Sequence, residues 1–265
     1  MKIYITVDAE GISGIMHSSQ THFDLEDYHE GRRYITEEVN ACVQGALEGG
    51  ATDVIVADKH GRGKNFIWHD LHEAARYVVG TTPELPGGRL PGIEGSDGLI
   101  LLGYHAMSGT PVAVLEHTWG HDCFNYSING RPSGEISMEM GLAADCGVPA
   151  IMISGDDKVC AEADTIVPGI VQAEVKKALS FHGAILLSRA AAHKLVREKA
   201  AEAVRKCKSF TPVQFATPVT MRWETSAKSV WYNIEDKPYA RLIDARTLEV
   251  SGDTFTQAFY RIMRK

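Results

Sequence analysis

The sequence predicts an α/β protein with three layers, in which a largely parallel sheet is covered by helices and a smaller α+β part follows at the C-terminus. Short apolar runs rich in β-branched residues alternate with helix-length segments over the first 190 of the 265 residues. This alternation is typical of parallel sheets, because each parallel strand needs a crossover, usually a helix, to reach its neighbour. The remaining residues have a different order, with a charge-rich helix followed by successive strands.

The first elements follow from apolar spacing and from residues that break helices. Residues 2–7 predict a buried strand that ends at Asp8, and residues 30–50 predict a helix with one apolar face, terminated by Gly49-Gly50. Further strands are expected over residues 53–57, 76–79, 99–102, 112–115, 123–128 and 148–153. Asn129-Gly130 predicts a hairpin turn, and residues 135–146 predict a helix that stops at Gly147.

The C-terminal part is predicted to contain two helices and three strands. The helices are expected over residues 188–208 and 253–263, and the strands over 213–223, 229–234 and 239–244. We therefore divide the chain into an α/β domain with the active site, residues 1–190, and a smaller domain, residues 191–265, which is a candidate for oligomerisation. No linker-like tract marks the boundary.

Composition limits the class of protein. Hydrophobic residues make up 44% of the chain and charged residues 23%, which suits a packed core. The net charge of -7 repels phosphate backbones and argues against binding of nucleic acid. The five cysteines are dispersed, and neither a signal-peptide pattern nor a bilayer-spanning apolar stretch is present, so we expect a cytoplasmic protein without a membrane partner.

Acidic and imidazole side chains recur where predicted strands end. Asp8 and Glu10 follow the first strand, two residues apart, and extended chain would point both to the same side. His60 follows the second strand, and His105 follows the strand over residues 99–102. Singly, such residues are more often helix caps or surface groups. Their recurrence favours a metal site, because the carboxyl ends of parallel strands meet at one edge of the sheet.

Other polar residues leave two interpretations open. Glu135 begins a predicted helix and is either a first-turn acid favoured by the helix dipole or a fifth metal ligand. His117 ends the strand expected over residues 112–115 and is either a surface residue or a catalytic one. The pair Asp156-Asp157 is expected to cap the next helix, although Asp157 could contact a substrate amine.

The ligand set consists of carboxylates and imidazoles without thiolates, which suits Zn²⁺, Mn²⁺, Co²⁺ or Fe²⁺. Five ligands exceed what one catalytic zinc needs, so we expect two metal ions that share a carboxylate and activate an amide for hydrolysis. The segment Gly61-Arg62-Gly63-Lys64 superficially suggests a phosphate loop, but it lacks the required spacing and the Ser or Thr after the lysine. Three more histidines lie in a predicted loop that could border the site: His17, His22 and His29.

Ordered motifs over the first 190 residues resemble one family. The run Thr6-Val7-Asp8-Ala9-Glu10-Gly11 is similar to the Ser-x-Asp-x-Glu-Gly signature of the D-aminopeptidase (DppA-type) metallopeptidases, once described as dipeptide transport proteins, with Thr6 in place of the serine. The resemblance continues in order through further segments: Asp58-Lys59-His60, Leu102-Gly103-Tyr104-His105-Ala106, Asn129-Gly130-Arg131-Pro132, Gly134-Glu135 and Ser154-Gly155-Asp156-Asp157. The C-terminal part matches only in general pattern.

The resemblance implies ligands, chemistry and assembly. The family's ligands would fall on Asp8, Glu10, His60, His105 and Glu135, with Asp8 bridging two zinc ions, and its active-site residue would fall on His117. We expect His117 to transfer a proton or stabilise an oxyanion rather than to act as the nucleophile. The family's substrates are short peptides that begin with a D-residue, such as D-Ala-D-Ala, and its members form a ring-shaped homodecamer.

Two other functions fit the same sequence. A dinuclear site equally suits another amidase or a phosphoesterase, although the sequence offers no clear arginine clamp for phosphate. A dipeptide-binding protein without enzymatic activity is the second alternative, and a periplasmic binder of that kind would carry a secretory signal.

Overall fold

The computed structural model describes residues 1–80, 89–227, 234 and 236–263. Within these residues, the larger sheet has seven strands in the order β3-β2-β1-β4-β7-β8-β9, and neighbours run parallel except for β9, which is antiparallel to β8. The strands are β1 (Lys2–Val7), β2 (Asp53–Asp58), β3 (Arg76–Val78), β4 (Gly98–Tyr104), β7 (Ala150–Asp156), β8 (Val171–Ser180) and β9 (Gly183–Leu186). The prediction of a largely parallel sheet is confirmed.

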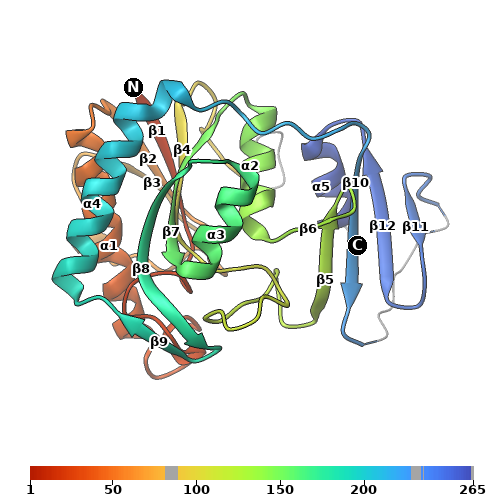
Figure 1. The fold of residues 1–265 in the computed structure, drawn as a ribbon, viewed down its shortest axis with the longest axis horizontal. Coiled ribbons are helices and arrows are strands. Elements are labelled where there is room, and N and C mark those ends of the chain that lie inside the picture. The colour runs from red at the N-terminus through yellow and green to blue at the C-terminus, as the bar shows by residue number, and fades with distance from the viewer. Residues whose placement is uncertain (81–88, 228–233, 235, 264–265) are drawn as a thin grey trace.

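Helices cover both faces of this sheet. α1 (Tyr28–Glu48) and α4 (Arg189–Lys206) pack side by side on one face, and α2 (Glu135–Asp145) and α3 (Asp157–Ile166) lie on the other (Figure 1). Successive residues of β1 point to opposite faces, so Ile5 joins the apolar cluster under α1 and α4, whereas Tyr4 joins the cluster on the opposite side. Both faces are therefore dry, as parallel strands require.

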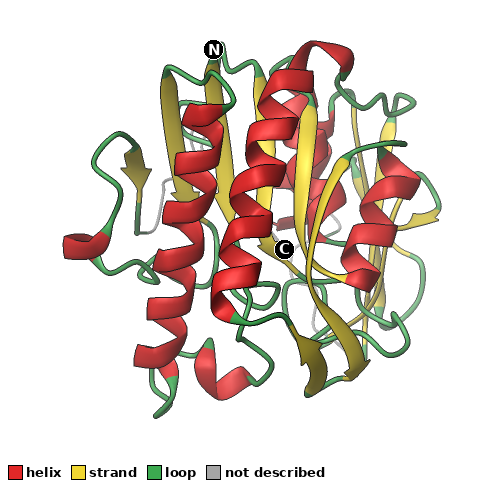
Figure 2. Cartoon of the chain, turned by 60° about the vertical axis from the view of Figure 1, so that its left-hand side comes forward, coloured by secondary structure: helices red, strands yellow, loops and turns green. Residues whose placement is uncertain are grey.

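A smaller antiparallel sheet forms a further layer. Its strands have the order β11-β12-β10-β5-β6, and α5 (Phe255–Met263) packs between this sheet and α2 (Figures 1 and 2). The strands are β5 (Cys123–Ile128), β6 (Arg131–Pro132), β10 (Val219–Thr225), β11 (Ala240–Leu242) and β12 (Thr247–Gly252). The second sheet thus combines strands from both sides of residue 190, while α4 packs on the first sheet.

The strand predicted over residues 112–115 is wrong. This segment forms turns, with left-handed backbone at Val112 (φ 55°) and Leu115 (φ 51°). Its buried amides find partners outside a sheet, because Val114 donates to the Asp156 carboxylate and Leu115 donates to the carbonyl of Phe181. An apolar run can be buried as a loop when side chains and other loops satisfy its backbone.

Other differences have local causes. The strand expected over 213–223 begins only at Val219, because Pro218 has no N–H for a ladder. The strands β8, β9 and β12 were not predicted. The strand predicted over 229–234 falls, apart from Ile234, outside the described residues. The hairpin turn is confirmed, since Asn129 and Gly130 both have positive φ and join β5 to β6.

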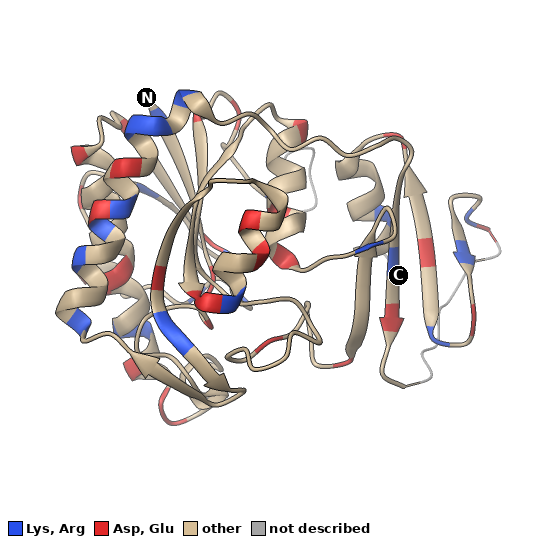
Figure 3. Cartoon of the chain, viewed as in Figure 1, with Lys and Arg blue, Asp and Glu red and all other residues tan. Residues whose placement is uncertain are grey.

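Along the helices, the positions of Lys and Arg are interspersed with those of Asp and Glu rather than gathered by sign (Figure 3). Two ion pairs connect α4 to α1, one between Arg189 and Glu37 and one between Arg197 and Glu48. Three short 3-10 segments complete the described elements: η1 (Ser18–Gln20), η2 (Trp68–Asp70) and η3 (Cys207–Ser209). Among the helices that the structure describes, none has the length and apolar character needed to cross a bilayer.

Candidate metal centre

The loop after β1 brings two carboxylates to the carboxyl edge of the sheet. β1 ends at Val7, so Asp8 and Glu10 lie on a turn and not on the extended chain that the sequence suggested. This turn crosses directly over the end of β4, where the Gly11 amide donates to the carbonyl of Gly103 at 2.8 Å. A Cβ atom at Gly11 would lie 1.9 Å from the Tyr104 carbonyl oxygen, so only glycine permits this approach.

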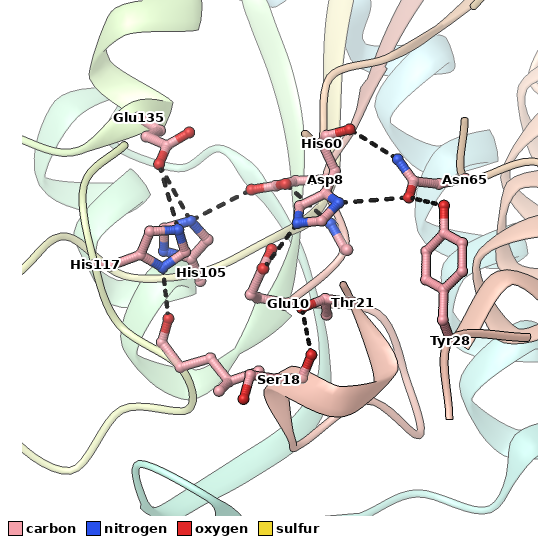
Figure 4. Close-up of polar contacts among 12 residues, drawn as sticks. Asp8, Glu10, Ser18, Thr21, Tyr28, His60, Asn65, His105, His117 and Glu135 are labelled. Carbon is pink, nitrogen blue, oxygen red and sulfur yellow. Dashed lines mark hydrogen bonds and ion pairs between the residues drawn. The ribbon is translucent and has the colours of Figure 1, made fainter. Parts of the chain in front are cut away.

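His60 reaches the same edge from the end of β2. Its Nε2 lies 3.1 Å from Glu10 Oε1 (Figure 4). The backbone around it is held by Asn65, whose side chain donates to Asp58 Oδ1 at 2.7 Å and to the His60 carbonyl at 2.8 Å. Tyr28 donates in turn to Asn65 Oδ1 at 3.0 Å. The sequence did not predict these contacts of Asn65 and Tyr28. A single amide or phenol side chain shows no spacing pattern from which its hydrogen-bond partners could be deduced.

His105 follows β4 and faces two carboxylates. Its Nε2 lies 3.4 Å from Asp8 Oδ2 and 3.5 Å from Glu135 Oε1. The other ring nitrogen, Nδ1, lies 2.9 Å from the carbonyl of Ala106 and must donate to it, because a carbonyl only accepts. In the neutral ring, Nε2 therefore presents a lone pair to the carboxylates, which is the orientation of a metal-ligating histidine.

His117 stacks on His105 and repeats its arrangement. The ring centroids are 3.9 Å apart with an interplanar angle of 11°. Nδ1 of His117 donates to the Leu115 carbonyl at 2.8 Å, and Nε2 lies 3.8 Å from Glu135 Oε1 (Figure 4). His117 thus joins the group although the strand expected before it is a turn.

Glu135 is the first residue of α2, where the helix dipole favours an acid, and its carboxylate also faces the other predicted ligands. Its Oε1 accepts the Trp119 amide at 2.8 Å and faces Nε2 of both His105 and His117. The structure therefore brings all six predicted site residues together. Asp156 caps α3 as expected, and Asp157 instead accepts the Ala178 amide. Of the three loop histidines, His22 lines the cavity described below, whereas the ring of His17 packs at a tilt against that of His182.

The pKa shifts in this group have a common origin in burial and mutual charge. Burial, with the neighbouring Glu10, raises the pKa of Asp8 well above its usual value. Burial also opposes ionisation of Glu10 and Glu135, but His60 beside Glu10 lowers its pKa well below normal, and His105 beside Glu135 lowers that pKa to about 2. Burial thus makes the charged forms of these neighbouring acids costly, and positive charge beside them lowers that cost.

Unpaired atoms of the site fit metal ligation. Among the described residues, three buried atoms at this point have no hydrogen-bond partner: Asp8 Oδ2, Glu10 Oε2 and His105 Nε2. Leaving such acceptors buried and unpaired is costly, and a bound cation removes the cost. Two groups of side chains place their ligand atoms within 4.8 Å of one another: Asp8, Glu10 and His105, and also His105, His117 and Glu135. Oxygen and imidazole ligands of this kind suit zinc.

A cavity of about 700 Å³ lies beside the group. One part of its wall carries the site residues Asp8, Glu10, His60, His117 and Glu135. The rest includes aromatic and basic side chains to which the sequence analysis assigned no role: Tyr28, Arg32, Lys59, Arg89 and Trp119. A volume in this range accommodates a small organic molecule or a short peptide.

A parallel α/β core that presents buried carboxylates and imidazoles to such a cavity has the arrangement expected of a metal-dependent hydrolase. Comparison with known proteins narrows the class. The family model described as D-aminopeptidase matches residues 1–264. The chain belongs to this family, and it is a hydrolase that acts on peptide bonds.

Two further comparisons, one of sequence and one of structure, support the assignment. The D-aminopeptidase of Bacillus subtilis (strain 168) is 35% identical over 216 residues, which cover 80% of this chain and 78% of that protein. A solved structure, described as the Zn-dependent D-aminopeptidase DppA from Bacillus subtilis, a self-compartmentalizing protease, matches with a TM-score of 0.92 and 28% identity. The match covers 100% of this chain and 96% of that chain.

Proposed function

We propose that this protein is a zinc-dependent aminopeptidase that hydrolyses short peptides beginning with a D-amino acid, of which D-Ala-D-Ala is representative. Two zinc ions per chain would be held by Asp8, Glu10, His60, His105 and Glu135, with Mn²⁺ and Co²⁺ as other ions that suit these ligands. The observation that carries the proposal is the set of buried, unpaired ligand atoms on Asp8, Glu10 and His105 beside a cavity of peptide size. The names of the relatives support the peptide substrate and its stereochemistry.

The bound ions would polarise the scissile carbonyl and activate water for attack on it. The carboxylate and imidazole groups named above would hold these ions at the wall of the cavity. His117 would move a proton at Nε2, since its Nδ1 is committed to the Leu115 carbonyl and keeps the ring in one tautomer. The same Nε2, once protonated, would stabilise the developing oxyanion.

We further propose that copies of the chain assemble into a ring-shaped homo-oligomer, expected to be a decamer, which works in the cytoplasm. The structural relative that compartmentalises itself supports assembly of this kind. Such a ring would admit short or unfolded peptides and exclude folded proteins. Residues 191–265 remain the proposed oligomerisation part.

The test combines metal content with stereospecific activity. We expect about two zinc ions per chain, hydrolysis of D-Ala-D-Ala, and little hydrolysis of L-Ala-L-Ala. Chelation should abolish activity and added zinc should restore it. His105→Gln should lose zinc and activity, whereas His69→Gln, an exposed histidine that does not line the cavity, is the matched control. Activity that survives stringent chelation or the His105→Gln change would refute the proposal.

A further inference from the structure

The geometry points to a carboxylate-binding subsite, formed by Arg62 and Lys64, that holds the free C-terminus of the peptide substrate. The enzyme would then select short peptides with a free carboxyl terminus over peptides that are amidated or extended there. This inference rests on the proposed aminopeptidase function and specifies its substrate class.

Arg62 and Lys64 lie at one end of the row of site residues. Both side chains line the cavity, and both belong to the loop that follows β2 and carries His60. In the sheet order β2-β1-β4, His60 therefore lies at one end, the β1 carboxylates in the middle, and His105 at the other end. A peptide lying along this row with its scissile carbonyl near the carboxylates would direct one terminus toward Arg62 and Lys64.

The loop that presents these two cations has a defined conformation. Gly61 and Gly63 adopt left-handed backbone, with φ of 55° and 64°. A Cβ atom on Gly63 would lie 2.8 Å from backbone atoms of Gly80, so the loop packs tightly against the segment after β3. Asn65 closes the loop through its bonds to Asp58 and to the His60 carbonyl, and Tyr28 donates to the Lys64 carbonyl at 3.1 Å. The cations therefore project from an ordered turn.

The charges of Arg62 and Lys64 are available to a ligand. In the part of the chain that the structure describes, neither forms an ion pair, and both side chains are exposed. The guanidinium of Arg62 lies 4.9 Å from the ring centroid of Phe23. Stacking of this kind orients the guanidinium plane and leaves its donor edge free for a carboxylate.

The other cations of the cavity wall are already engaged within the protein. Lys59 donates to the carbonyl of Arg89, and Arg32 donates to the carbonyl of Phe66. Arg89 is paired with the buried Glu139 at 2.8 Å. Arg62 and Lys64 are thus the described cavity lysine and arginine residues whose side chains make no hydrogen bond or ion pair to a protein acceptor, whereas Arg32 keeps one unpaired donor, Nε, which is buried.

The reach of a short peptide agrees with this position. Each extended residue spans about 3.5 Å, so the terminal carboxylate of a di- or tripeptide lies within about 7 Å of the first carbonyl. Arg62 and Lys64 follow His60 by two and four residues and line the same cavity as the site residues, so their long side chains would meet a carboxylate at such a distance. In a longer peptide the carboxylate would lie beyond this loop, and the interaction would be lost.

The test compares D-Ala-D-Ala with its C-terminal amide on the zinc-loaded protein. We expect kcat/KM for the free acid to exceed that for the amide by about fivefold, because ion pairs with exposed side chains contribute only modestly to binding. In Arg62→Gln and Lys64→Gln the ratio of the two kcat/KM values should fall, and in the double variant it should approach unity. Arg33→Gln, which removes an exposed charge on α1 outside the cavity, is the matched control and should keep the ratio.

An equal kcat/KM for acid and amide in the unaltered protein would overturn the inference. So would a ratio that stays the same in the double variant. Absence of turnover for both peptides would refute the aminopeptidase proposal instead. In that event the subsite can still be tested by calorimetric measurement of the binding of both peptides to the purified protein. The subsite requires the free acid to bind more tightly than the amide, and equal affinities would overturn it. Turnover of small phosphate esters that depends on Arg62 would assign the two cations to phosphate and not to a peptide terminus.

Discussion

Replacement of Lys176 by methionine tests how the loop that carries Glu10 is held. Lys176 lies on β8 and is 2% exposed. Its ammonium donates to three backbone carbonyls of the loop after β1, those of Glu10 at 2.6 Å, Ile12 at 2.9 Å and Ile15 at 2.5 Å. Methionine has a similar length but no donor, so Lys176→Met would leave these carbonyls without their partner.

The expected effect is large because the network is buried and charge-assisted. Removing one partner from a buried charged network costs about 3–5 kcal/mol. For a chain of this length such a loss lowers Tm by roughly 10 °C. Zinc affinity should also fall, by about 10- to 100-fold, since groups that orient a ligand typically contribute this much. Burial lowers the pKa of Lys176 to about 8, so the measurement belongs at pH 7, where the ammonium is present.

The assay pairs calorimetric melting with zinc titration against a competing chelator. Lys177→Met is the matched control, because Lys177 is the next residue of β8 and is exposed. We expect the control to melt within about 2 °C of the unaltered protein, as surface substitutions usually do. The reasoning would be refuted if Lys176→Met matched this control in both Tm and zinc affinity.

Three further predictions concern pH, backbone packing and metal. Burial raises the pKa of Glu162 from 4.5 to about 7. Between these pH values the folded chain keeps a proton that the unfolded chain has released, so stability should fall by about 2–3 kcal/mol as pH rises through this window. In Glu162→Gln, the free energy of unfolding measured by urea titration should change less with pH over this window. The same dependence on pH as in the unaltered protein would contradict the burial argument. Gly11→Ala should cost about 3 kcal/mol or more, because its Cβ would meet the Tyr104 carbonyl, whereas Gly95→Ala meets no atom within 4 Å and should cost only about 1 kcal/mol in thermal melts. Equal melting of the two variants would exclude the steric reason. Chelation of zinc should lower Tm by roughly 10 °C if the metal is present at about a thousand times its Kd, and zinc should restore it. A Tm that is the same with and without chelator would contradict metal binding at this site.

The sequence was informative about the site because strand ends converge in parallel sheets. The sequence predicted that His60 and His105 would meet Asp8 and Glu10 at one edge of the sheet, and the strand order of the structure explains why they do, since β2 and β4 are the two neighbours of β1. For Asp8 and Glu10, the sequence indicated extended chain that points both side chains the same way. In the structure they instead lie on the turn that follows β1. Glu135 and His117 could not be derived from spacing, because α2 and the turn before His117 are placed by tertiary packing.

The parts that were missed share a physical cause. β8 breaks the apolar pattern of a strand with Lys176, which is buried only because the loop after β1 supplies acceptors for it. Residues 112–115 show the reverse case, since their apolar side chains predicted a strand while Val112 and Leu115 adopt left-handed backbone. In both cases the polar groups find hydrogen-bond partners in segments that are distant in the sequence, and such partners cannot be predicted from the local sequence.

The pairing of β5 with β10 has a consequence for biosynthesis. Tyr126 of β5 bonds to Met221 of β10, 95 positions later in the chain. At about 5–20 residues per second, a ribosome needs roughly 5–20 s to make the intervening segment. During that interval the apolar side chains of β5, including Cys123 and Ile128, have no finished sheet to join. A nascent chain arrested before residue 219 should therefore bind holding chaperones through β5 even when the first sheet has formed.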